Sequence, residues 1–77
     1  MPNVKLYGTQ ACPHCKQTRD FLRKNNINFE DFDVSRDKEK AEEMQKKSGE
    51  MSVPVIDVDG KIIKGFDEDA LKATLGI

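Results

Sequence analysis

The chain has 77 residues, of which 36% are hydrophobic and 35% charged, so it suffices for one small domain, residues 1–77, and leaves no room for a second. Its 13 basic and 14 acidic side chains give a net charge of −1, which excludes an overall field favouring nucleic acid or an anionic membrane. No stretch approaches membrane-spanning length, and the N-terminal residues lack the apolar run of a signal peptide, so we expect a cytoplasmic monomer.

The first third of the chain predicts a strand followed by a helix. Residues 3–7 alternate apolar and polar side chains with a period of two, which is typical of a short strand. After a loop, Pro13 suits the first position of a helix, where its missing amide hydrogen is not needed. Inward-facing side chains then recur at helical spacing as far as Lys24, and Asn25 and Asn26 follow as stop and turn residues.

A second strand and a second helix are expected next. Residues 27–34 place Phe29 and Phe32 on opposite faces, which favours a central strand covered by helices on both sides, as in a parallel βαβ unit. Residues 35–48 are rich in Lys and Glu and carry only a thin apolar stripe. We interpret their charge as the solvated face of a helix that Gly49 ends.

The last part of the chain predicts a hairpin and a helix. Residues 55–58 are dense in β-branched side chains, and Asp59-Gly60 is a strong signal for a two-residue turn into an antiparallel strand at residues 61–64. Gly65-Phe66 turns the chain, and Asp67 can cap a last helix. The order βαβ-α-ββ-α predicts an α/β fold with a four-stranded mixed sheet and three helices distributed over both faces.

Both cysteines and the only histidine of the chain lie within Cys12-Pro13-His14-Cys15. If Cys12 caps the helix, the two sulfurs lie about one turn apart, with the first toward solvent and the second toward the interior, and a disulfide can open and close with little backbone movement. Free amide groups at the helix N-terminus favour the Cys12 thiolate, and the His14 ring is a candidate to add to that effect. A Cys-x-x-Cys where the first strand of a βαβ unit feeds its helix is a thioredoxin-like redox signature.

Other roles for the two cysteines fit the sequence less well. A disulfide between Cys12 and Cys15 would close a loop too short to stabilise the fold. Tetrahedral zinc needs about four ligands, and the sequence holds no second cysteine pair and no second histidine to complete them. We therefore expect no metal site and no tightly bound cofactor, while a cluster shared by two chains stays open.

Three segments, in this order, resemble the active-site segments of the glutaredoxin family. They are Val4-Lys5-Leu6-Tyr7-Gly8-Thr9 leading to Cys12-Pro13-His14-Cys15, then Ser52-Val53-Pro54, then Gly65-Phe66-Asp67. The chain is most similar to the short bacterial and archaeal glutaredoxin-like group that includes the NrdH-type redoxins. The resemblance implies a thioredoxin-like (glutaredoxin) fold and a thiol-disulfide oxidoreductase, with Cys12 as nucleophile and Cys15 as resolving thiol.

The same resemblance implies how a substrate is held. The family's proline, matched by Pro54, is in cis beside the active-site sulfur and leaves the backbone of Val53 to pair with an extended peptide or with glutathione. Amides at the start of the last helix, near Phe66 and Asp67, are expected to bind a carboxylate of glutathione, the implied co-substrate. The expected catalytic residues are Cys12, Cys15, His14 and Pro54, and the expected binding residues are Thr9, Pro13, Ser52, Val53, Pro54, Gly65, Phe66 and Asp67.

The chain departs from the family pattern at positions that bear on the choice of reductant. Thr9 stands where many dithiol glutaredoxins carry a lysine for glutathione, and His14 replaces a tyrosine. Lys64-Gly65 replaces a Gly-Gly pair, and Glu50 and Met51 occupy positions that are often basic or amide. These changes weaken the assumption that glutathione is the only reductant.

Several alternatives remain open at this point. The protein is expected to act on disulfide-containing or glutathionylated client proteins and to be reduced by glutathione, or by thioredoxin reductase if it is an NrdH-type electron donor. An iron-sulfur carrier, in which two chains share a cluster through Cys12 and glutathione, is an alternative of another class that Pro13 disfavours. The sequence also leaves open whether Cys12 is the natural residue, because some relatives carry selenocysteine there.

Overall fold

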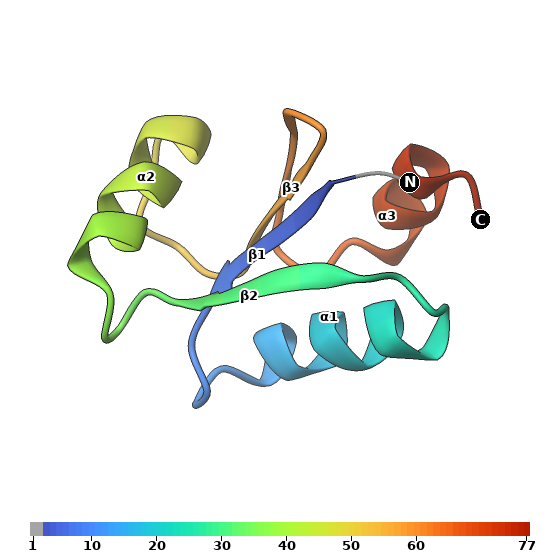
Figure 1. The fold of residues 1–77 in the computed structure, drawn as a ribbon, viewed down its shortest axis with the longest axis horizontal. Coiled ribbons are helices and arrows are strands. Elements are labelled where there is room, and N and C mark those ends of the chain that lie inside the picture. Colours follow the sequence, from blue (N-terminus) through green and yellow to red (C-terminus); the bar gives the residue numbers. More distant parts are fainter. Residues whose placement is uncertain (1–2) are drawn as a thin grey trace.

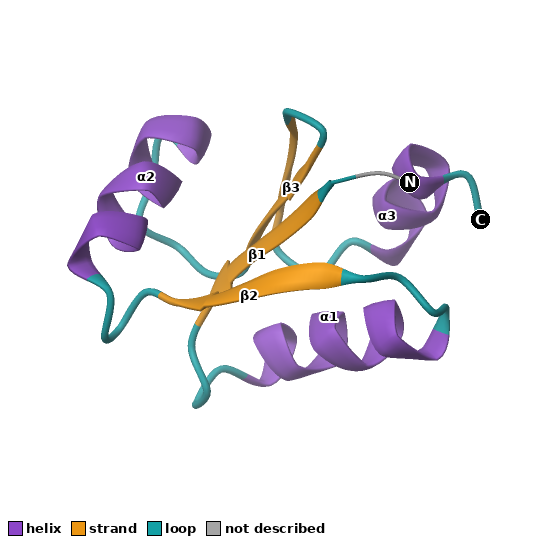
Figure 2. Ribbon diagram, in the orientation of Figure 1, coloured by secondary structure: helices purple, strands orange, loops and turns teal. Residues whose placement is uncertain are grey.

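The computed structural model describes residues 3–77, so Met1 and Pro2 of the predicted domain lie outside the described residues. The elements follow the predicted order and form the expected α/β, thioredoxin-like arrangement of three helices and a mixed four-stranded sheet (Figures 1 and 2). They are β1 (Val4–Gly8), α1 (Pro13–Lys24), β2 (Phe29–Asp33), α2 (Lys38–Ser48), β3 (Val55–Val58), β4 (Lys61–Lys64) and α3 (Glu68–Leu75).

The strands lie in the order β2-β1-β3-β4, with β1 parallel to β2 and antiparallel to β3, and β3 antiparallel to β4. The prediction of a central second strand is therefore wrong, because β2 forms an edge of the sheet. Its aromatic side chains nevertheless pack on both faces: Phe29 lies against the core that contains Leu6, and Phe32 against the core that contains Tyr7. Coverage by helices on both faces does not require a strand to be central.

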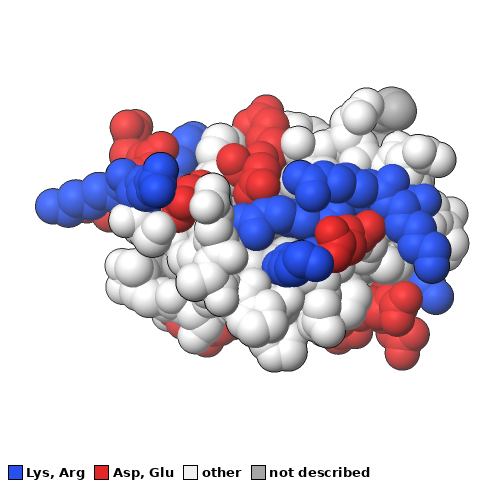
Figure 3. All heavy atoms as spheres, turned by 90° about the horizontal axis from the view of Figure 1, so that it is seen from below, with Lys and Arg blue, Asp and Glu red and all other residues white. Residues whose placement is uncertain are grey.

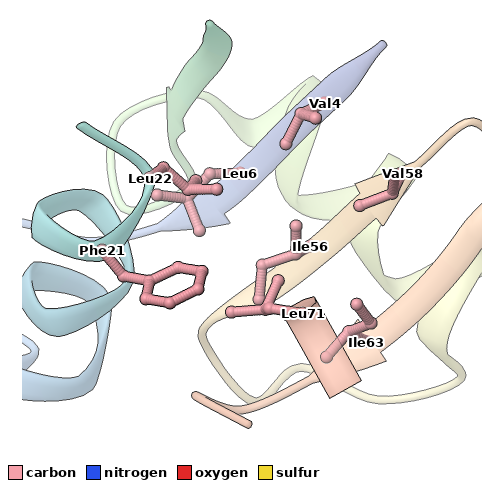
Figure 4. Packing of buried hydrophobic residues seen from close by; sticks show 8 residues of the cluster. All are labelled: Val4, Leu6, Phe21, Leu22, Ile56, Val58, Ile63 and Leu71. Carbon is pink, nitrogen blue, oxygen red and sulfur yellow. The ribbon is translucent and has the colours of Figure 1, made fainter. Parts of the chain in front are cut away.

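Two hydrophobic cores lie on opposite faces of the sheet. On one face, α1 contributes Phe21 and Leu22, and α3 contributes Leu71 (Figure 4). The sheet residues of this core are Val4, Leu6, Ile56, Val58 and Ile63. On the other face α2 packs Met44 against Tyr7 and Val55. Because successive residues of a strand point to opposite faces, Leu6 and Tyr7 divide β1 between the two cores.

Helix α2 is also held to the sheet by charged groups. The Lys47 ammonium donates hydrogen bonds to the Tyr7 hydroxyl at 2.9 Å and to Asp57 Oδ2 at 2.6 Å. The buried Tyr7 hydroxyl in turn donates to Glu43. The interpretation of this Lys/Glu-rich stretch as a solvated face is therefore wrong in part. Lys47 and Glu43 of α2 contact Tyr7 and Asp57 of the sheet and so supplement the thin apolar stripe of the helix.

The predicted turns are confirmed by the backbone. Asp59 and Gly60 both have positive φ, 52° and 93°, which is the backbone that a two-residue turn between antiparallel strands requires. Gly49 ends α2 at a φ of 79°, and Asp37 and Asp67 cap α2 and α3 through their carboxylates. None of the helices formed by residues 3–77 combines the length and the apolar character that a membrane crossing requires.

Candidate redox-active site

The three segments singled out in the sequence meet at one end of the sheet. Tyr7 pairs with Val55, and Val55 pairs with Lys64. The segments after β1, before β3 and after β4 therefore lie at the same end of the sheet. The amide of Gly65 donates to the carbonyl of Pro54 at 2.8 Å, which joins the last two segments directly. The fold thereby gathers residues that are more than 50 positions apart in the sequence.

Cys12 is the N-cap of α1, with extended backbone, and Pro13 occupies the first helical position as predicted. The Cys12 side chain makes no capping hydrogen bond and is half-exposed. The pKa of the Cys12 thiol lies below its ordinary value, first because the backbone amide of Cys15 favours negative charge on the nearby sulfur, and further through the Cys15 side chain and the His14 amide. Orphan amides at the helix N-terminus thus favour the thiolate.

Cys15 lies one turn further along α1 and is fully buried. Its side chain packs on Gly8 at the end of β1: a Cβ added at Gly8 would lie 2.8 Å from the Cys15 sulfur. Burial raises the pKa of the Cys15 thiol above its ordinary value, and the neighbouring Cys12 acts in the same direction. The nearby backbone amide of Thr9 opposes this rise.

The two thiols are therefore unequal in both exposure and acidity. Cys12 is accessible and inclined to ionise, whereas Cys15 is enclosed and inclined to keep its proton. Thiolates attack disulfides, and neutral thiols do not. Such a pair can attack an external disulfide through its first sulfur and can close an internal disulfide through its second.

The segment 52–54 has the backbone that the resemblance implied. The Val53-Pro54 peptide bond is cis, Pro54 is buried and Ser52 is exposed. Val53 is half-buried and packs against the core that contains Tyr7. The placement of this segment beside the end of β1 is compatible with the binding role expected of it.

The segment 65–67 lies at the start of α3. The Phe66 ring meets the Phe21 ring of α1 edge-on, with 6.0 Å between their centres. Asp67 accepts a hydrogen bond from the Ala70 amide at 3.1 Å and so caps the helix. Asp67 is exposed, which leaves its second carboxylate oxygen accessible to a ligand.

Two of the expected site residues have other local contacts. The exposed His14 ring places Nδ1 3.2 Å from Gln17 Oε1, along α1. Thr9 is half-buried. Its backbone amide lies near the Cys15 sulfur, and its carbonyl accepts a hydrogen bond from Arg19. The proposed effect of the His14 ring on Cys12 and the binding role of Thr9 remain predictions.

Sequence reasoning missed Arg19 as part of this site and the close packing of Gly8 on Cys15. Gly8 belongs to the first of the three segments that resemble the family, but no role of its own was predicted for it, although a glycine at the end of the strand before a Cys-x-x-Cys could have signalled a close approach. Arg19 follows Cys15 by four residues, so both lie on the same face of α1, and this spacing could have identified it. The Arg19 side chain is only 12% exposed.

The surroundings of the two cysteines include a polar hollow beside α1. Within residues 3–77 no three His, Cys, Asp or Glu side chains are arranged to hold a metal ion. A polar hollow of about 270 Å³ lies between α1 and β2 and is not the expected substrate groove; it is lined by Gln10, Arg19, Arg23, Asp31 and Asp33.

Comparisons with known proteins agree with this geometry. The sequence model of the family described as Glutaredoxin matches residues 4–63. An uncharacterized glutaredoxin-like 8.6 kDa protein in the rubredoxin operon of Clostridium pasteurianum is 45% identical over 65 residues, which cover 84% of this chain and 87% of that protein. Glutaredoxin 3 of Escherichia coli K12 is 34% identical over 68 residues, covering 88% and 82%. The crystal structure of a glutaredoxin from Archaeoglobus fulgidus matches with a TM-score of 0.89 and 34% identity, covering 97% of this chain and 87% of that chain.

Proposed function

This chain belongs to the glutaredoxin family, a family of thiol-disulfide oxidoreductases, and from that premise we propose that it works by a dithiol mechanism through Cys12 and Cys15. The observation that carries the proposal is the inequality of the two thiols at the start of α1. An accessible, acidic thiol beside an enclosed, less acidic one suits the two successive steps of disulfide exchange.

In the first step the Cys12 thiolate attacks one sulfur of a substrate disulfide. A mixed disulfide forms, and the other substrate sulfur leaves as a thiolate and takes up a proton. In the second step the Cys15 sulfur attacks Cys12, the bond between Cys12 and the substrate breaks, and the Cys12-Cys15 disulfide forms. Two electrons pass from the cysteine pair to the substrate, and an external reductant must then restore both thiols.

The substrate is held, in this proposal, by the segments that flank Cys12. The backbone of Val53 pairs with an extended peptide or with glutathione, and the amides at the start of α3, near Phe66 and Asp67, bind a carboxylate. Exposed Ser52 and Asp67 at the end of the sheet that also carries Cys12 support this arrangement. The same surface would receive glutathionylated and disulfide-containing proteins.

Glutathione is the first candidate for the reductant, and thioredoxin reductase, as for an NrdH-type donor, is the second. The second is favoured by Thr9, which brings no charge for a glutathione carboxylate, and by Met51, which is 55% exposed where relatives often carry a basic or amide side chain. We place the reaction in the cytoplasm, which supplies reductants of both kinds.

The proposed roles of the two cysteines are tested by serine variants. Cys12→Ser is expected to abolish turnover of both protein disulfides and glutathionylated peptides. Cys15→Ser is expected to lose protein-disulfide reduction and to keep removal of glutathione, because that reaction can proceed through Cys12 alone. Turnover remaining in Cys12→Ser would refute the nucleophile assigned here.

The reductant is identified by a separate assay. The Cys12-Cys15 disulfide is offered glutathione with glutathione reductase, and in parallel thioredoxin reductase with NADPH. Sustained turnover in only one of the two mixtures identifies the reductant, and turnover with thioredoxin reductase alone replaces the first candidate by the second.

A further inference from the structure

Arg19 differs from the other basic residues of α1 in how firmly it is held. Figure 3, viewed from the α1 side, shows Lys and Arg side chains gathered over this face. The basic residues of α1 are Lys16, Arg19, Arg23 and Lys24. Among these four, Arg19 alone donates two hydrogen bonds to the Asp31 carboxylate of β2, from Nε at 2.8 Å and from Nη2 at 3.2 Å. A fork of this kind fixes both the position and the orientation of the guanidinium.

A third bond from Arg19 reaches the loop before Cys12. Its Nη1 donates to the carbonyl of Thr9 at 3.1 Å. The backbone amide of the same Thr9 lies near enough to the sulfur of Cys15 to lower the pKa of that thiol. Asp31, Arg19, Thr9 and Cys15 thus form a continuous chain of contacts from the edge strand to the buried thiol.

Arg19 is also close to the Cys15 sulfur itself. A Cβ placed on Gly8 would lie 2.8 Å from Cys15 Sγ and 3.7 Å from Arg19 Nη2, so the sulfur and the guanidinium flank the same point. The arginine is paired with protein groups and most of its side chain is covered, which leaves it poorly available as a site for a free anion. Its charge is instead directed toward the interior of the redox site.

We propose that Arg19 is a positioning residue for the second step of the reaction: anchored by Asp31, it fixes Thr9 against Cys15 and keeps a permanent positive charge beside the sulfur that must become a thiolate. The inference rests on the dithiol mechanism proposed above. In that step Cys15 loses its proton to solvent and attacks Cys12 Sγ. The Cys12-Cys15 bond forms, and the substrate sulfur leaves with the electron pair of its broken bond to Cys12 and takes up a proton.

The charges around Cys15 determine how this step depends on pH. Cys12 and Arg19 face it from α1, and Asp31 and Asp33 of β2 lie behind the guanidinium and reduce its field without removing it. β1 places the uncharged Gly8 against the Cys15 sulfur. Because burial disfavours the Cys15 thiolate and Arg19 favours it, loss of the guanidinium moves the pH profile of the second step upward.

The two steps are separated by dithiobis(nitrobenzoate), an aromatic disulfide that releases one coloured thionitrobenzoate at each attack. The first release reports Cys12 and the second reports Cys15. In Arg19→Gln we expect a second release about tenfold slower at neutral pH, since one pKa unit changes the thiolate fraction tenfold. The first release should slow much less, because the pKa of Cys12 is lowered mainly by the amides at the start of α1 and only last by the charge of Arg19. The pH profile of the second release in this variant is expected to shift upward by about one pH unit.

Matched variants distinguish this role from a structural one. Arg23→Gln makes the same substitution one turn further along α1, at a guanidinium that lies 5.9 Å over the Phe29 ring, and is expected to keep both releases. Arg19→Lys keeps the charge without the fork and is expected to recover part of the second rate. Asp31→Asn weakens the anchor and is expected to slow the second release less than Arg19→Gln does, which provides a test if Arg19→Gln does not fold.

The outcomes are distinct for the inference and for the dithiol mechanism. A second release in Arg19→Gln with the parent rate and pH profile overturns the role of Arg19 while the mechanism stands. Equal slowing of both releases also overturns it, because it indicates a general loss of structure. Absence of the first release from the parent protein refutes Cys12 as nucleophile and with it the mechanism.

Discussion

The sulfur of Cys15 lies directly against the backbone of Gly8, so close that a Cβ at Gly8 would approach it to 2.8 Å. Real Cβ atoms essentially never come this near to another heavy atom, so one of the two would have to move. The enclosed thiol therefore occupies space that the glycine leaves free. The absence of a side chain at Gly8, at the end of β1, therefore makes room for the sulfur of Cys15 on α1.

Gly8→Ala is expected to lower the free energy of unfolding by about 1–3 kcal/mol, because the added methyl group overpacks the space beside Cys15. Denaturant titration of the reduced protein measures this. In a Cys15→Ala background the same substitution should cost less, since the sulfur it meets is gone. An equal cost in both backgrounds would show that Cys15 is not the origin of the strain.

The two thiols are expected to react with iodoacetamide at different pH. Half-maximal alkylation of Cys12 should fall below the ordinary cysteine pKa of about 8.5, and that of Cys15 above it, because a backbone amide favours the first thiolate and burial opposes the second. Mass spectrometry of the reduced protein after short exposures identifies the modified residue. Earlier modification of Cys15 would contradict this assignment.

Lys47→Met is expected to destabilise the fold by about 1–3 kcal/mol, because it leaves the buried Asp57 carboxylate without its partner. Lys16→Met is the matched control: its ion pair with Asp20 is exposed, and its loss should cost no more than about 0.5 kcal/mol. Both values come from denaturant titration at neutral pH. Equal costs would show that Lys47 contributes no more than a surface charge.

The same ion pair predicts how stability depends on pH. Burial works against the charge of Asp57, but hydrogen bonds from Lys47 and the Gly60 amide prevail, so the pKa of this carboxyl lies below its ordinary value. Its contribution to stability is therefore complete above about pH 4 and is lost as pH falls through the lowered pKa. The stability difference between the parent and Asp57→Asn should narrow over that range, and a constant difference would contradict the assignment.

His14→Tyr tests whether the exposed imidazole stabilises the Cys12 thiolate. If it does, the variant stabilises the reduced form less and its reduction potential becomes more negative, by about 30 mV for each tenfold change in the equilibrium with glutathione. Gln17→Ala, which removes the hydrogen-bond partner of the ring, serves as a control for a change of ring orientation. An unchanged potential in His14→Tyr refutes the effect.

Asp67 is expected to combine capping with ligand binding, and two variants separate these. Asp67→Ala removes the cap and should cost about 1 kcal/mol of stability, whereas Asp67→Asn keeps a capping oxygen and loses the charge. Turnover with glutathione, measured where both variants are folded, reports the ligand role. Because Asp67→Asn changes charge alone, a KM for glutathione that differs between it and Asp67→Ala indicates a role for the side-chain oxygen.

Local residues made most of the fold predictable. Pro13 begins a helix, Gly49 ends one and Asp59-Gly60 turns a hairpin through the backbone angles these residues allow, and such preferences do not depend on distant parts of the chain. The Cys-x-x-Cys spacing likewise placed one sulfur outward and one inward before any tertiary contact was known.

The unpredicted features all depend on which distant segments meet. The edge position of β2 follows from the hairpin joining the other side of β1, which no residue within β2 encodes. Lys47 looks like any other lysine of a charged helix until the sheet brings Asp57 to it, and Arg19 becomes part of the site only when β2 brings Asp31. Their partners, 10 and 12 residues away, are set by topology rather than by periodicity.

The unequal attachment of the helices suggests a hierarchy of local unfolding. Helices α1 and α3 share a hydrocarbon core, whereas α2 depends on a thin apolar stripe supplemented by ion pairs on the opposite face. Acid or concentrated salt weakens charge contacts far more than hydrocarbon packing. Amide hydrogens of α2 should therefore exchange with solvent before those of α1, so the protein can loosen one layer while the redox layer keeps its protection.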